Sequence, residues 1–287
     1  MHVVSAAPIV HWHTVRCGMH NLRVTPPGVL LTAAGPQMRD VMHELALPTF
    51  RRYAQRWGYA VHAVDLPTDG VGADSAAQRA KWEKIRLMRQ ALTNFPLVVW
   101  LDADVLLMRD DDDIAGHLHP THFQALALEH VPAEHRTNPN TGVWLMRKHA
   151  RAFQFLDAVE AAGQQPGPWA DQGAVLAALG WNRGDERYWW AGPGRGTRFL
   201  SGTSWLPSGW NQPYVDGRVD ADLYNGSASS YTDRPLVPNP HAVHFMGMTP
   251  FSRYRHMSLV ARSGRAALGV GPEHDAGRRV AGAELLT

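Results

Sequence analysis

One short apolar run constrains the fold of this chain more than any other feature. Residues 97–101 read Leu-Val-Val-Trp-Leu, without a polar residue on either alternating face, and Pro96 precedes them. A strand that is apolar on both faces is buried on both faces, and such strands occur in parallel sheets covered by helices on each side. The run therefore predicts a central strand of an α/β domain.

The segments around this strand alternate between the strand and the helix period. Apolar residues fall in short runs in some of them and recur at three- and four-residue steps in others. This order predicts a Rossmann-like α/β fold with a mostly parallel central sheet and helices on both faces. Pro48 should divide the first helix and Gly58 should end it. In chain order, we expect strands at 28–35, 59–66, 97–101, 123–128 and 143–146, and helices at 42–57, 74–95, 148–162 and 169–179.

The composition along the chain indicates a single domain over residues 28–263. An N-terminal extension or hairpin at 1–27 should precede it, and a flexible tail rich in Gly, Ala and Arg should follow at 264–287. Within the domain, residues 181–240 lose periodicity and are rich in Gly, Pro, Trp, Asn and Ser. Such composition is typical of loops that carry function, and the many Trp favour ordered loops.

Bulk composition excludes several classes of function. The formal net charge is only +2, which argues against a nucleic-acid partner. No run approaches the roughly 18 apolar residues of a membrane span, and the first residues lack the apolar core of a signal peptide. The single cysteine, Cys17, permits no intramolecular disulfide and fits a reducing compartment. We therefore expect a cytoplasmic protein.

A pair of carboxylates follows the central strand directly. Asp102 and Asp104 flank Ala103 at the carboxyl end of the strand, which is the edge where open α/β sheets bind ligands. Residues two apart on a strand share a face, with Cα atoms roughly 6–7 Å apart. Two carboxylates aimed the same way repel each other unless a cation joins them, and a divalent ion that bridges a pyrophosphate supplies that cation. The alternative is two ordinary loop carboxylates. The nearby acids 110–113 are interpreted as helix-capping residues.

Several short motifs in a fixed order resemble a known family. They are Lys84 through Leu106, Asn140-Thr141-Gly142, Asp171-Gln172 and His244-Phe245-x-Gly247. Over residues 28–250 this series resembles the fungal and plant galactosyl-, mannosyl- and xylosyltransferases, and is similar to bacterial lipopolysaccharide galactosyltransferases and glycogenin-type enzymes. The resemblance implies a GT-A fold for 28–263, with 181–240 as acceptor-side loops. It also implies a retaining hexosyl- or pentosyltransferase.

The resemblance further implies roles for individual residues. Asp102, Asp104 and His244 would bind a divalent metal, and the imidazole favours Mn²⁺ over Mg²⁺. Asp171 and Gln172 would lie against the transferred sugar as the catalytic pair. The partners implied are a UDP- or GDP-sugar and a soluble acceptor such as a small metabolite. The residues expected to contact the donor are Thr32, Ala33, Gly35, Lys84, Asp102, Ala103, Asp104, Asn140, Gly142, Gly247 and Arg253.

The chain departs from the family pattern at one position. Members usually carry a Lys shortly after His-x-x-Gly to hold the diphosphate, whereas residues 248–253 read Met-Thr-Pro-Phe-Ser-Arg. Arg253 or Arg255 is expected to replace it, because a guanidinium binds phosphate well.

Other interpretations of these residues remain open. A lone His such as His244 is more often structural than a ligand, and Asp171 at a helix start also suits a purely structural role. A phosphatase of the haloacid-dehalogenase kind would use Asp102 as nucleophile and Asp104 as general acid with Mg²⁺. It should place this motif near the N-terminus and add a later acidic pair, neither of which we find. A non-catalytic binder of nucleotide sugars is the third hypothesis, favoured by the missing Lys.

Overall fold

The computed structural model describes residues 25–67, 73–131, 136–166, 169–183, 190–214, 237 and 239–263. The expected extension at 1–27 lies almost entirely outside these ranges, and the expected tail at 264–287 lies wholly outside them.

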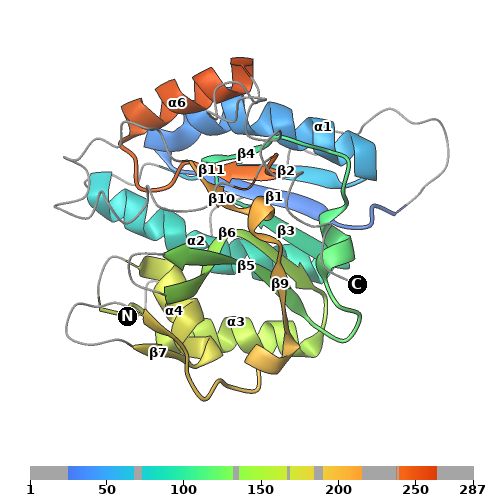
Figure 1. The fold of residues 1–287 in the computed structure, drawn as a ribbon, viewed down its shortest axis with the longest axis vertical. Coiled ribbons are helices and arrows are strands. Elements are labelled where there is room, and N and C mark those ends of the chain that lie inside the picture. The colour runs from blue at the N-terminus through green and yellow to red at the C-terminus, as the bar shows by residue number, and fades with distance from the viewer. Residues whose placement is uncertain are drawn as a thin grey trace, which may run out of the picture.

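A six-stranded sheet forms the centre of the molecule (Figure 1). Its strands are β1 (Val29–Ala34), β2 (Ala60–Asp65), β3 (Leu97–Leu101), β5 (Gln124–Val131), β6 (Arg136–Arg147) and β9 (Thr203–Leu206), in the order β2-β1-β3-β6-β5-β9. β6 pairs antiparallel with both of its neighbours, while the other pairs are parallel. The mostly parallel sheet predicted from sequence is confirmed, with β6 as the one reversed strand.

Helices cover both faces of this sheet (Figure 1). One face carries the π-helical turn η2 (Val41–Ala46), α1 (Leu47–Trp57) and α6 (Pro250–Ser263), and the other carries α2 (Ala73–Asn94), α3 (Ala150–Ala162) and α4 (Ala170–Leu179). Among the helices of the described ranges, none is long and apolar enough to cross a membrane.

The central strand β3 joins the two cores, as its sequence predicted. Val99 and Leu101 belong to the core under α1 and α6, whereas Val98 and Trp100 belong to the core under α2, α3 and α4. All four side chains are at most 2% exposed. Because the strand is fixed by packing on both faces, the turn that follows it at Asp102 has a rigid support.

A small second sheet positions the residues that follow β3. It consists of β10 (Gln212–Pro213), β11 (Ala242–His244) and β4 (Val105–Leu107), with β11 between the other two. β11 runs antiparallel to β4, with His244 opposite Val105. The backbone N–H of Phe245 also donates to the carbonyl of Asp104 at 2.9 Å. This register brings His244 to the turn after β3 although 140 positions separate it from Asp104 in the sequence.

The remaining elements are short. The described parts of 181–240 are more regular than the sequence suggested, because they include several strands and turns that pack on the main sheet. Of the acids 110–113, only Asp113 takes the predicted capping role, since its carboxylate accepts from the backbone N–H of Ala115. The other three pair with Arg52, Arg109 and His117. The short elements outside the two sheets and the covering helices are η1 (Pro36–Met38), η3 (Ile114–His117), β7 (Trp181–Arg183), β8 (Trp190–Pro193), η5 (Leu200–Gly202) and η6 (Ser208–Trp210).

The two predicted helix signals near α1 are confirmed. Pro48 lies in the first turn of α1, just where the helix changes from the π-helical turn to the α-helix. Gly58 ends α1 in the left-handed conformation, with φ +79°.

We predict that Gly58→Ala lowers the free energy of unfolding by about 1–2 kcal/mol, because an L-residue is strained at this φ. Space is not the cause, since the nearest atom to a new Cβ lies 3.8 Å away. Gly116→Ala is the matched control, because a Cβ there meets nothing within 4 Å and its φ is not positive. Urea unfolding of both variants provides the measurement; equal losses of stability would contradict the prediction.

Candidate metal centre and cavity

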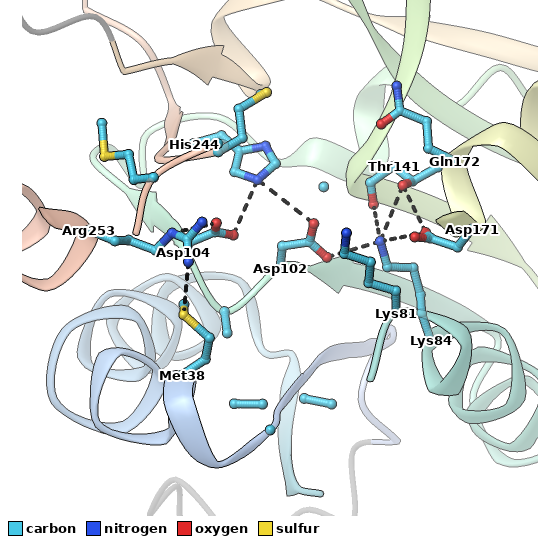
Figure 2. Close-up of a pocket in the computed structure, with 18 of the residues that line it drawn as sticks. Met38, Lys81, Lys84, Asp102, Asp104, Thr141, Asp171, Gln172, His244 and Arg253 are labelled. Carbon is cyan, nitrogen blue, oxygen red and sulfur yellow. Dashed lines mark hydrogen bonds and ion pairs between the residues drawn. The ribbon is translucent and has the colours of Figure 1, made fainter. Parts of the chain in front are cut away.

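A cavity of about 710 Å³ opens at the carboxyl ends of β1 and β3. Its walls come from five places: the loop after β1, the helix α2, the turn after β3, β6 with the start of α4, and the segment from β11 into α6. Figure 2 shows charged side chains from these walls pointing toward one another across the cavity. The cavity therefore collects residues from almost the whole described chain.

The two carboxylates lie in a tight turn rather than on the strand itself. β3 ends at Leu101, and the backbone N–H of Val105 donates to the carbonyl of Asp102 at 3.0 Å, which closes the turn. Ala103 is only 7% exposed and packs into the core, so Asp102 and Asp104 are both left facing the cavity. The expected common orientation is present, although a turn and not strand periodicity produces it.

His244 completes a three-residue group with these carboxylates. Its Nε2 lies 3.2 Å from Asp104 Oδ1 and 3.8 Å from Asp102 Oδ2. One ligand atom from each of the three residues lies within 4.8 Å of the other two, which is a spacing that a single metal ion can span. Two carboxylate oxygens and one imidazole nitrogen form a mixed donor set that suits Mn²⁺ and also accepts Mg²⁺.

A chain of amides fixes the orientation of the His244 ring. The backbone N–H of Gly142 donates to Asn140 Oδ1 at 2.8 Å, so Asn140 must present its oxygen there. Asn211 Nδ2 donates to the same oxygen at 2.8 Å, which leaves Asn211 Oδ1 to accept from His244 Nδ1 at 3.0 Å. With Nδ1 carrying a proton, Nε2 is the atom directed at the carboxylates. Partners of this kind orient ligating histidines in metal proteins.

Gly142 is required next to this ring for steric reasons. A Cβ at position 142 would lie 2.2 Å from His244 Cε1 and 2.5 Å from Nδ1. No rotamer change of a ring held by Asn211 relieves such an overlap. The Asn-Thr-Gly motif of β6 therefore supports the ring at two points, through the Asn140 amide and through the missing side chain of Gly142.

Each carboxylate of the turn keeps one oxygen for a ligand and gives the other to the protein. Asp102 Oδ1 accepts from Trp100 Nε1 at 2.6 Å and lies 3.0 Å from Lys84 Nζ. Asp104 Oδ2 lies 3.0 Å from Arg253 Nε. The two remaining oxygens are the ones that face His244 Nε2.

Burial and charge act in opposite directions on these groups. Burial raises the pKa of Asp104, but Arg253 and His244 outweigh it and hold that pKa well below its usual range. Burial lowers the pKa of His244, and the two carboxylates more than compensate, so the net shift is upward. Asp104 thus stays ionised in the turn, as a metal ligand must.

A buried lysine links the turn to α4. Lys84 is 3% exposed, and its Nζ lies 3.0 Å from Asp102 Oδ1 and 2.9 Å from Asp171 Oδ2. It also donates to the Thr141 carbonyl at 3.2 Å, and the Thr141 hydroxyl donates to Asp171 Oδ2 at 3.0 Å. Burial lowers the pKa of Lys84, but Asp102 and Asp171 outweigh that effect and raise it overall. A charged Lys84 therefore bridges both carboxylates.

Most of the residues predicted to contact a donor line this one cavity. Gln172 lines it too, and its Nε2 donates to the Pro139 carbonyl at 3.1 Å. Thr32 does not line it, because its side chain is buried within β1. Arg253 is among the lining residues, whereas Arg255 lies on the exposed side of α6. The predicted residues that the structure brings together are Ala33, Gly35, Lys84, Asp102, Ala103, Asp104, Asn140, Gly142, Asp171, Gln172, His244, Gly247 and Arg253.

Sequence reasoning missed the residues that support the site from behind. Asn211 holds the His244 ring, and Thr141 joins Lys84 to Asp171. The only sequence signal for Asn211 was the Trp210-Asn211 pair, and Thr141 lay inside a motif whose other members drew attention. Trp169 and Met38 line the cavity without any signal in the sequence.

Comparison with known proteins finds a family model that matches the N-terminal half of the described chain. Residues 29–163 match the galactosyl transferase GMA12/MNN10 family. No curated protein matches the sequence.

Several solved structures are similar in fold. WbbM, a bifunctional glycosyltransferase, shares 9% identity over 90% of this chain and 52% of its own, with a TM-score of 0.50. A glycosyltransferase involved in the glycosylation of the major capsid of PBCV-1 shares 16% identity over 82% of this chain and all of its own, with a TM-score of 0.49. Mouse xyloside xylosyltransferase 1 shares 12% identity over 78% of this chain and 99% of its own, with a TM-score of 0.47.

We predict that Asp104→Ala and His244→Ala each weaken Mn²⁺ binding by well over tenfold, because each removes one of three ligands. Asn211→Ala should weaken it by about 10–100-fold, the usual effect of losing the partner that orients a ligand. Asp111→Ala is the charge-matched control, since that side chain is 57% exposed and lies outside the cavity. Calorimetric titration with Mn²⁺ measures the effect. Wild-type affinity in Asp104→Ala would exclude this metal centre.

Proposed function

This chain has the fold of GT-A glycosyltransferases and matches one of their families over residues 29–163, and on that premise we propose that it transfers a sugar from a nucleotide-diphosphate sugar to an acceptor with retention of configuration. The observation that carries the proposal is the group formed by Asp102, Asp104 and His244, with one free ligand atom from each directed at the same point of the cavity.

The donor set supports a divalent metal as the cofactor of this proposed reaction. Asp102 Oδ2, Asp104 Oδ1 and His244 Nε2 would hold it, and the nitrogen ligand favours Mn²⁺, with Mg²⁺ as the alternative. When bound, such an ion neutralises the charge of a diphosphate. The protein's own contribution is to orient these three ligand atoms, through Trp100, Lys84, Arg253 and Asn211.

The cavity has a suitable arrangement for the parts of a nucleotide sugar. The small residues Ala33 and Gly35 at the carboxyl end of β1 leave room for the nucleoside of a UDP- or GDP-sugar. The diphosphate would lie at the metal ligands, beside Ala103 and Gly247, with Arg253 behind Asp104. The sugar would extend toward Asn140, Gly142, Lys84 and the start of α4. All of these residues line the cavity.

The surroundings of Asp171 support retention. An inverting enzyme needs a free base near the acceptor, but the Asp171 carboxylate is 4% exposed and is held by Lys84 and Thr141. Among the described residues that line the cavity, every carboxylate has such a cation partner. In a front-face reaction the departing diphosphate takes the acceptor proton, so no protein base is required. Asp171 and Gln172 then stabilise the cationic sugar and orient it.

We propose a soluble acceptor such as a small metabolite, bound beside Gln172 and near the loops of 181–240, and a cytoplasmic location in keeping with the single Cys17. The phosphatase alternative has no support in the family match or the fold. The non-catalytic binder differs from the enzyme only in lacking turnover, so an activity assay separates them.

We predict that the protein with Mn²⁺ releases nucleoside diphosphate from at least one UDP- or GDP-sugar in the presence of acceptor. Asp104→Ala should lower this release at least 100-fold, and chelation should abolish it, because the diphosphate charge is then uncompensated. Asp111→Ala should leave the rate unchanged. Binding without release across a full donor panel would identify a binder, and full activity of Asp104→Ala under chelation would exclude the proposed mechanism.

We predict that an α-linked donor yields an α-linked product, which proton NMR of the anomeric signal determines. Asp171→Asn should slow transfer at least tenfold while nucleotide binding stays within about twofold, because Asp171 lies beside the sugar rather than the nucleotide. A β-linked product would refute retention and make Asp171 a candidate base.

A further inference from the structure

The cationic side chains of Lys84, Arg253 and Lys81 line the cavity, and the first two are held by carboxylates of the cavity. Lys84 lies between Asp102 and Asp171, at 3.0 and 2.9 Å. Arg253 Nε lies 3.0 Å from Asp104 Oδ2 and donates to the Phe245 carbonyl at 2.9 Å. These contacts are buried and hold both cations in place. Neither can turn to another anion without uncovering a buried carboxylate, which is costly.

Lys81 is the third cation, and it differs from the other two. It lies one helical turn before Lys84 on α2, so the two side chains leave the same face of the helix. Figure 2 shows them reaching the cavity side by side, next to Asp102. Lys81 lines the cavity but remains exposed to solvent, and within the described part of the chain it makes no ion pair or hydrogen bond.

The charge balance of the cavity indicates a role for Lys81. With His244 neutral, as a metal ligand must be, the three carboxylates of the cavity exceed Lys84 and Arg253 by one negative charge. A divalent ion and the two negative charges of a nucleotide-diphosphate sugar cancel each other, so the loaded cavity would keep that excess if Lys81 were absent. The charge of Lys81 cancels it. Because an opposite charge nearby favours an anion, the ammonium should move toward the diphosphate when the donor enters.

We propose that Lys81 binds the diphosphate of the donor and stabilises it as the leaving group. This inference rests on the proposed glycosyltransferase function. In that reaction the anomeric carbon exchanges its bond to the diphosphate oxygen for a bond to the acceptor oxygen. The diphosphate keeps the electron pair of the broken bond, and the acceptor proton moves onto it. The ammonium of Lys81 faces the oxygens on which negative charge grows, so its contact strengthens as the bond breaks.

Lys81 and Arg253 have different roles, since Arg253 holds Asp104 and Lys81 contacts the diphosphate. Arg253 also contacts Met38 Sδ through Nη1, at 3.0 Å, so its guanidinium is held at three points beside Asp104. It keeps Asp104 ionised and oriented toward the metal. Lys81 has a flexible stem, and its ammonium has no partner among the described residues, which suits a group that must follow the phosphate during bond breaking. Loss of Arg253 should therefore weaken metal binding, whereas loss of Lys81 should not.

The test is calorimetric binding of UDP and GDP, and of the corresponding monophosphates, to the full chain with saturating Mn²⁺. For whichever base binds, Lys81→Ala should weaken diphosphate binding about tenfold or more, the usual effect of losing a charge-assisted contact, and monophosphate binding no more than twofold. Lys81→Arg should restore most of the diphosphate affinity. Binding of Mn²⁺ alone should not change in either variant, which separates a phosphate contact from a structural role.

Arg255→Ala is the matched control, because it removes a cation that is exposed on α6 and does not line the cavity. Diphosphate affinity of Lys81→Ala within twofold of wild type would overturn the role of Lys81 and leave the proposed function intact. If the wild-type protein binds neither UDP nor GDP with Mn²⁺, the proposed function fails and the role of Lys81 fails with it.

Discussion

The pairing of three carboxylates with two cations is the interaction on which the rest of this structure depends. Asp102, Asp104 and Asp171 face one cavity and repel one another, and each lies within 3.0 Å of a cationic side chain that offsets this repulsion. Lys84 and Arg253 supply those cations from helices on opposite faces of the sheet. The fold therefore holds two helices, α2 and α6, against the ends of the same strands for electrostatic as well as packing reasons.

The balance between these charges is what prepares the site for ligands. Each carboxylate of the turn meets a cation through one oxygen, from Lys84 or Arg253, and turns the other oxygen toward His244, so the charges are offset without giving up the ligand atoms. An uncharged turn would bind no metal, and a turn with no internal cations would repel itself. The arrangement lies between these extremes, and a metal with a diphosphate adds no net charge to it.

Rigidity comes from the residues behind the charged ones. β3 is packed on both faces, the amides of Asn140 and Asn211 hold the His244 ring, and Gly142 leaves that ring its space. Catalytic groups held in this way need no reorganisation when charge develops in a reaction. Lys81 is the exception, because no described residue holds its ammonium. In the proposed reaction this ammonium can follow the diphosphate as the bond to the sugar breaks.

The sequence alone predicted the helices α1 to α4, the strands β1, β2, β3, β5 and β6, and the carboxylate pair, because these depend on local periodicity and on residues close together in the chain. The helix α6 and the short strands β4, β7, β8, β9 and β10 were not predicted. Leu97–Leu101 is the central strand that its apolar run indicated, and Gly58 ends α1 as its position suggested. β6 was underestimated: 143–146 was predicted, whereas the strand spans Arg136–Arg147. Its first half reads Arg-Thr-Asn-Pro-Asn-Thr, which is poor in strand formers, and pairing with β5 overrides that preference.

Tertiary structure alone decided how the site is assembled. His244 reaches the carboxylates through the register of β11 against β4, and Asn211 reaches His244 across the small sheet. The pairing of Lys84 with both Asp102 and Asp171 depends on how α2 and α4 pack, and so does the isolation of Lys81 one turn away. Local sequence fixes which groups are charged, but a charge's partner depends on distances of a few ångströms between segments far apart in the chain, and packing alone sets those distances.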